Sequence, residues 1–132
     1  MGFHSLEGYE TNKPGFGAFI GRVANRISNA SFTLNGKVYQ LDQNDETNCL
    51  HGGNNRFERC MYKTECSMEE GEDKVSFTRV SKDMEQGFPG NLTVTVTYTL
   101  NDADEMIIEY YGVSDEDTVI NLHHLMYRSL SL

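Results

Sequence analysis

The sequence predicts an all-β fold of antiparallel strands. In residues 92–100, Leu, Val and Tyr alternate strictly with threonine, and a period of two predicts a strand with one buried face. The pair Asn35-Gly36 separates two short apolar segments and favours the positive φ angles of a type I′ hairpin turn. No segment has a long 3.6-residue apolar period with helix caps. Strand spacing alone fits either a sandwich or a barrel.

Each expected strand is bounded by a turn sequence. The strands are expected at residues 32–34, 38–41, 61–68, 75–80, 92–100, 106–113 and about 118–125. Asn-Gly joins the first two strands, EEGED the next two, and NDADE the two after those, while SDED precedes the last strand. The segments 43–57 and 81–90 are long enough to carry functional residues.

The length and charge of the chain narrow its possible partners. A chain of 132 residues suits one domain with a buried core, and no linker or repeat divides residues 1–132. The formal net charge of −9 would repel nucleic acid and anionic membranes, which leaves a neutral small molecule as the expected partner. No run approaches the roughly 18 apolar residues of a membrane helix, and residues 1–10 lack signal-peptide features. We therefore expect a cytoplasmic protein.

Three segments together resemble one known family. They are FGAFIGRVANRI (16–27), CLHGGNNRF (49–57) and EQGFPGNLTVTVTYTL (85–100). In this order they are similar to the aldose 1-epimerases, also called galactose mutarotases. The resemblance implies an antiparallel β-sandwich, the supersandwich of that family. This chain would supply a central portion of it, as a single partial domain that lacks strands at both ends.

The resemblance also implies an activity, the interconversion of the α and β anomers of hexoses such as galactose and glucose. A base takes the proton of the anomeric hydroxyl and an acid protonates the ring oxygen. The ring opens, the bond between C1 and C2 rotates, and closure gives the other anomer. This chemistry implies no cofactor and no metal.

Three residues match the sugar-binding positions of the family. Asn25 and Arg26 lie in the NRI motif, and His51 lies in LHGG. Arginine suits this role because its planar, permanently charged fork of donors can hold two oxygen atoms at once. The glycines after His51 allow a tight turn that brings the imidazole to the mouth of a cleft. Arg22, by contrast, is interpreted as a surface residue in an ion pair.

The catalytic acid of the family is a histidine in the segment NLTNHSYFNL, which corresponds here to NLHHLMYRSL (121–130). This correspondence places Leu125 at the position of that histidine. Strand parity points His123 to the same face as residue 125 but about 6.6 Å further back, and points His124 to the opposite face. His124 would need a bulge or a one-residue shift to reach the site. Either histidine is a candidate acid.

Two hypotheses of different class follow. In the first, the chain is an aldose 1-epimerase, whose glutamate base would lie beyond Leu132. In the second, it is a non-catalytic or vestigial sugar-binding module that keeps Asn25, Arg26 and His51 but lacks the acid and the base. In either case, a homo-oligomer or a complementing second chain could cover exposed strand edges.

Overall fold

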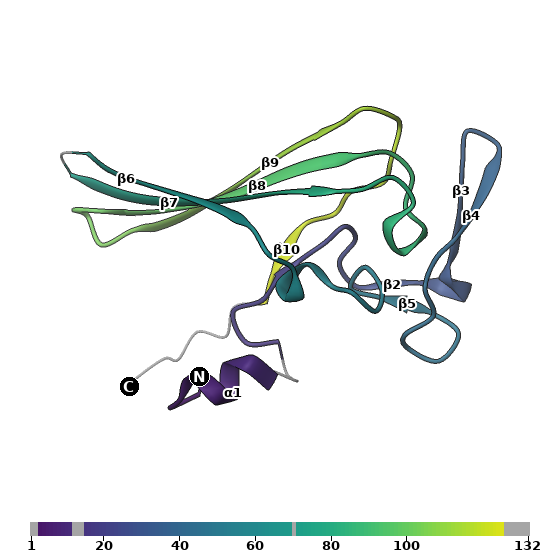
Figure 1. Ribbon diagram of the computed structural model, residues 1–132, viewed down its shortest axis with the longest axis horizontal. Coiled ribbons are helices and arrows are strands. Elements are labelled where there is room, and N and C mark those ends of the chain that lie inside the picture. Colours follow the sequence, from purple (N-terminus) through teal and green to yellow (C-terminus); the bar gives the residue numbers. More distant parts are fainter. Residues whose placement is uncertain (1–2, 12–14, 70, 126–132) are drawn as a thin grey trace.

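The computed structural model describes residues 3–11, 15–69 and 71–125. The largest element in this part of the chain is a four-stranded antiparallel sheet (Figure 1). Each strand pairs with the next strand in the sequence. The strands are β6 (Lys63–Glu69), β7 (Glu72–Ser81), β8 (Leu92–Asn101) and β9 (Met106–Ser114). Four of the expected strands are therefore confirmed, and they form one meander.

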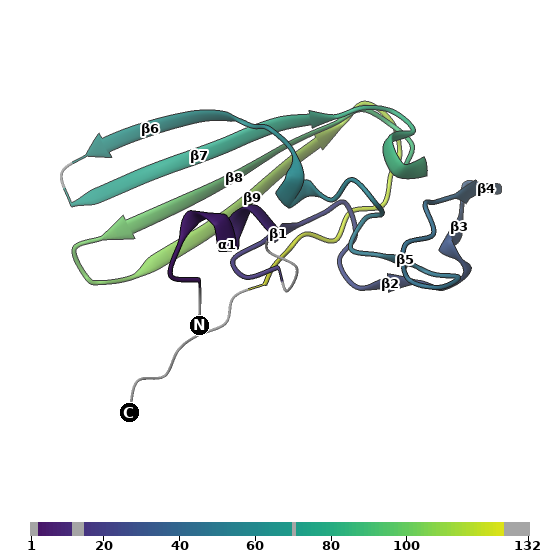
Figure 2. The same cartoon turned by 60° about the horizontal axis from the view of Figure 1, so that its bottom comes forward.

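The alternation in β8 gives this sheet its buried face. Leu92, Val94 and Val96 are each at most 2% exposed, whereas the threonines between them are partly exposed. The pattern ends before the strand does, because Leu100 is 55% exposed and Thr99 is buried. At this end the sheet projects past the segments that cover its other half (Figures 1 and 2). Leu100 is therefore open to solvent although the sequence pattern places it on the buried face.

The described residues also form three two-stranded sheets, which lie below the meander or beside its end (Figure 1). They pair β1 (Phe19–Ile20) with β10 (His123–His124), β2 (Arg26–Ile27) with β5 (Cys49–Leu50), and β3 (Ser31–Leu34) with β4 (Lys37–Gln40). The last pair is the expected hairpin, and its turn residues Asn35 and Gly36 have φ values of 51° and 77°. The type I′ prediction required positive φ at both positions, and this is confirmed.

The remaining elements are short. A six-residue helix α1 (Leu6–Thr11) was not expected, and single 3₁₀ turns occupy Ser28–Ala30, Phe57–Arg59 and Glu85–Gly87. The strand expected over residues 118–125 is reduced to β10 and an isolated bridge between Val23 and Asn121. Within the described ranges, no helix is long and apolar enough to cross a membrane.

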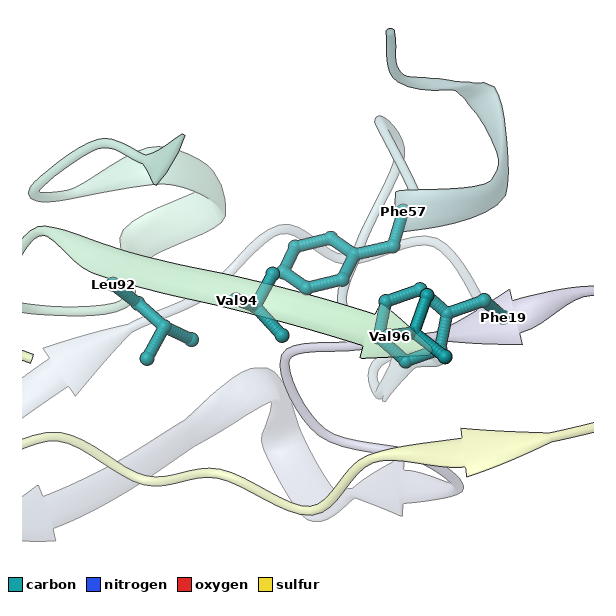
Figure 3. Packing of buried hydrophobic residues seen from close by; sticks show 5 residues of the cluster. All are labelled: Phe19, Phe57, Leu92, Val94 and Val96. Carbon is teal, nitrogen blue, oxygen red and sulfur yellow. The ribbon is translucent and has the colours of Figure 1, made fainter. Parts of the chain in front are cut away.

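Apolar side chains from both layers form the main core. Figure 3 shows the rings of Phe19 and Phe57 against Val94 and Val96 of β8, with Leu92 at one end. The two phenyl rings lie 5.8 Å apart between centroids. Full burial of a side chain of this kind contributes about 1.5–3 kcal/mol. The core therefore holds the segments of β1 and of residues 57–59 against the sheet.

The interpretation of Arg22 as a surface residue is wrong. Its side chain is only 1% exposed, and its five N–H groups donate to six acceptors, so that one N–H is shared between two of them. The acceptors are the hydroxyl groups of Ser81 and Thr118 and the carbonyl oxygens of Ser81, Lys82, Pro89 and Gly90. These groups replace water around the guanidinium, although burial still lowers the pKa of Arg22. The residue links β1 to the loop before β8 from inside the protein.

Candidate functional site

A polar pocket of about 310 Å³ lies beside the short strands. Its lining comes from the segment between β1 and β2, the turn after β5, and the segment leading through β10. The lining residues are Ala24, Asn25, His51, Asn121, His123 and Leu125. Asn25 and His123 are exposed and His51 is partly buried, so the pocket is open to solvent. Three residues predicted from the sequence thus lie around one pocket.

Backbone pairing on two sides holds the segment 22–26 in place. On one side, Ala24 N donates to the carbonyl oxygen of Asn121 at 2.8 Å, and Asn121 N donates to that of Arg22 at 2.9 Å. On the other side, Arg26 pairs with Leu50 in the β2–β5 ladder. The pocket therefore lies where residues distant in sequence are joined by main-chain hydrogen bonds.

The backbone of His51 adopts a left-handed turn. Its φ is 55°, and Gly52 follows with a φ of 85°. A Cβ atom on Gly52 would lie 2.1 Å from the carbonyl oxygen of Gly21, so only glycine permits this approach. The tight turn predicted from LHGG is present, and it brings His51 against the segment that carries Asn25.

Two reciprocal hydrogen bonds join Asn25 and His51. His51 N donates to the carbonyl oxygen of Asn25 at 3.0 Å, and Asn25 N donates to Nδ1 of His51 at 3.1 Å. A backbone N–H can only donate, so Nδ1 must be the acceptor and the neutral ring carries its proton on Nε2. Burial, followed by the positive charge of Arg56, lowers the pKa of His51. The ring is therefore a neutral Nε2–H donor near pH 7.

Arg26 lies beside this pocket but does not line it. Its side chain is 56% exposed, and its Nε lies 2.7 Å from Oδ2 of Asp45. The Arg26 charge is near enough to His51 to contribute to the lowering of the imidazole pKa. Asp45 lies in the long segment 43–57 that the sequence marks as functional, but nothing in the sequence singled it out.

The two candidate acids face opposite sides of β10. His123 lines the pocket, whereas the His124 ring packs 6.0 Å from the ring of Phe19 in the core. His124 Nε2 lies 2.8 Å from the hydroxyl of Tyr98, and its Nδ1 lies 3.3 Å from that of Tyr110. Burial lowers the pKa of His124. The pairing of Phe19 with His124 and of Ile20 with His123 is regular, so no bulge turns His124 towards the pocket.

Asn121 is a lining residue that the sequence did not identify as functional. It served there only as a marker of the segment 121–130, although an amide side chain can both donate and accept hydrogen bonds. A larger hollow of about 740 Å³ lies between α1 and the sheet. Aromatic and aliphatic residues supply much of its lining, and none of the predicted site residues belongs to it. The smaller pocket is therefore the better candidate site.

The fold and the pocket together define a class of protein. It is an antiparallel β protein in which amide and imidazole side chains line a polar pocket. A sequence model of the family described as aldose 1-epimerase matches residues 1–125. This chain therefore belongs to the aldose 1-epimerase family, and both the resemblance and the all-β prediction are confirmed.

Individual relatives support this assignment. The chain is 44% identical to galactose mutarotase of Rattus norvegicus and 43% identical to aldose 1-epimerase of Haemophilus influenzae. These alignments cover 99% and 95% of this chain but only 37% and 36% of the relatives. The crystal structure of galactose 1-epimerase from Lactobacillus acidophilus superimposes with a TM-score of 0.86 at 25% identity, over 92% of this chain and 36% of that one. The chain thus spans about 37% of the length of the curated relatives it matches.

Proposed function

We propose that the pocket at Asn25, His51 and His123 binds a hexose and serves the interconversion of its α and β anomers. The observation that carries this proposal is the meeting of these three side chains at one polar pocket in a chain of the aldose 1-epimerase family. Among the described residues, the lining has amide and imidazole groups and no charged carboxylate or ammonium. Such groups suit the hydroxyl groups of a neutral sugar, since they can donate and accept hydrogen bonds.

The proposed roles follow from the geometry. The Nε2–H of His51 donates to a sugar oxygen, because its Nδ1 is already engaged by Asn25 N. His123 is the general acid that protonates the ring oxygen, since it lines the pocket whereas the His124 ring contacts the hydroxyl groups of Tyr98 and Tyr110. A histidine can perform this proton transfer once it lies within hydrogen-bond reach of the oxygen.

A specific observation favours a second candidate function, hexose binding without catalysis. Of the described residues that line the pocket, none is an aspartate or a glutamate. The described lining of the pocket therefore offers binding groups and an acid but no carboxylate base. In this alternative the chain holds a sugar and leaves its rate of anomer exchange unchanged.

Polarimetry of freshly dissolved α-galactose separates the two candidates. An enzyme should accelerate the approach to rotational equilibrium above the buffer rate, and His123→Ala should reduce this acceleration by about 10²-fold or more. His124→Phe is the matched control because its side chain lies away from the pocket. A rate equal to the buffer rate, together with measurable galactose binding, would favour the non-catalytic alternative. Absence of both acceleration and binding would contradict the proposed site.

A further inference from the structure

The ion pair of Arg26 and Asp45 differs from the exposed pair of Lys63 and Glu65 in the number of sequence positions that it spans. Lys63 and Glu65 also lie 2.7 Å apart, but they are near neighbours on the single strand β6. Arg26 and Asp45 instead join β2 to the loop that follows β4, across 19 positions of sequence. Exposed pairs contribute little to stability. The consequence of this contact is therefore the orientation it imposes on Arg26.

Asp45 lies on a loop that several hydrogen bonds hold in place. Its N and O atoms pair with Asn48 at 3.2 and 2.9 Å. The neighbouring side chain of Asn44 donates to the carbonyl oxygens of Leu50 and Gly53 at 2.8 and 2.7 Å, and its Oδ1 accepts from Leu50 N at 2.6 Å. These bonds fasten the loop to the segment that carries His51. The carboxylate of Asp45 therefore has a fixed place relative to the pocket.

The guanidinium of Arg26 uses only its Nε in this contact. Among the described residues, no group accepts a hydrogen bond from either Nη of Arg26. Two Nη groups in one plane can hold two adjacent oxygen atoms, which matches neighbouring hydroxyl groups on a sugar ring. An arginine anchored at Nε would not have to be ordered when the ligand binds.

We propose that Asp45 is the positioning residue of Arg26, fixing its Nε so that both Nη groups are free for two adjacent hydroxyl groups of the ligand. This inference rests on the proposed function, and its ligand is the hexose proposed there. Asp45 does not touch the sugar. It acts through Arg26 and lowers the entropic cost of binding.

The test compares galactose binding and side-chain mobility in the parent chain and in Asp45→Asn. This substitution keeps the shape of the side chain and removes the charge. We expect binding to weaken about two- to tenfold, the cost of ordering one long side chain on binding. The midpoint of thermal unfolding should not change. NMR relaxation of the Arg26 Nε–H group should show a mobile side chain in the variant and an ordered one in the parent. Asp45→Glu should restore part of the binding.

Two controls separate positioning from other effects. Glu65→Gln removes an exposed ion pair of the same length at a distance from the pocket, and it should leave binding unchanged. In an Arg26→Ala background, Asp45→Asn should have no further effect, since it acts only through Arg26. A further loss in that background would overturn the inference.

The outcomes also distinguish a failure of this inference from a failure of the proposed function. If the parent chain binds no galactose, the proposed function fails, and the ligand assignment fails with it. If the parent binds galactose and Asp45→Asn binds it equally well, only the positioning role fails. If the Arg26 side chain is equally mobile in the parent chain and in Asp45→Asn, the positioning role is overturned, whether or not the parent binds galactose.

Discussion

At the scale of single residues, the pocket depends on two side chains whose backbones are in the left-handed region. Asn25 has a φ of 67° and His51 a φ of 55°. Asparagine enters this region readily, and the glycine after His51 removes the steric conflict in the turn. Their reciprocal hydrogen bonds then decide which ring nitrogen of His51 carries the proton. The main-chain N–H of Asn25 thus determines that His51 offers an Nε2–H donor to a ligand.

The tautomer of His51 gives a prediction about substitutions. In His51→Gln the amide nitrogen can lie near the position of Nε2, whereas in His51→Asn it lies near that of Nδ1. We expect His51→Gln to retain more galactose affinity than His51→Asn, and His51→Ala to lose about tenfold, the equivalent of one hydrogen bond. Calorimetric titration of the three variants measures this order. Equal affinities for the Gln and Asn variants would contradict an Nε2–H donor.

At the scale of elements, β10 presents neighbouring histidines to two different environments. His123 faces the polar pocket, whereas His124 contacts Phe19 of the core and the hydroxyl groups of Tyr98 and Tyr110. Alternation along a strand produces this division without any special residue. Because Phe19 pairs with His124, the packing of the core and the placement of His123 depend on the same two-residue strand.

Protonation of His124 should therefore weaken the fold. Burial lowers its pKa below the ordinary value of 6.5, so the unfolded chain takes up a proton first as the pH falls. The stability contributed by neutral His124 is complete above pH 6.5 and is lost below it, at up to about 1.4 kcal/mol per pH unit. Urea unfolding between pH 7.5 and 5 measures the change. His51 contributes with the same sign, so the slope should become smaller, without vanishing, in His124→Phe; an unchanged slope would contradict this.

Local signals predicted the hairpins of this fold, and distant pairing could not be predicted. Asn35-Gly36 determines its own turn, and the alternation of 92–100 determines one face of β8. The sequence could not tell that β1 pairs with β10, because no local pattern encodes a contact between residues about a hundred positions apart. The same limit explains Arg22, whose burial depends on four carbonyl oxygens from another segment. Asn25 and His51 were identified through the family resemblance.

At the scale of the whole molecule, Arg22 joins segments that do not otherwise form a common sheet. Its side chain bonds the segments at 81–82 and 89–90 and the hydroxyl of Thr118. Its backbone carbonyl accepts from Asn121 beside the pocket. Ser81 also donates to the carboxylate of Glu85, and that negative charge offsets part of the effect of burial on the pKa of Arg22.

Arg22→Met should destabilise the protein by about 3–5 kcal/mol, because it leaves buried carbonyl oxygens without donors. Arg22→Lys should restore only part of this loss, since an ammonium group cannot supply the planar array of donors. Arg59→Met is the matched control, because Arg59 is exposed, and it should change the free energy of unfolding by less than about 0.5 kcal/mol. Chemical denaturation measures all three variants. A loss below about 1 kcal/mol for Arg22→Met would contradict a structural role.

The bonds of Arg22 also have a consequence for motion. Local openings of a protein occur in cooperative units whose members share hydrogen bonds. The loop before β8, Thr118 and the backbone at Asn121 all bond to this one residue, so none of them can open far without breaking a hydrogen bond to Arg22. Amide protons in these segments should therefore exchange with solvent at a common rate. The backbone at Asn121, which lines the pocket, then opens as rarely as the buried arginine is released.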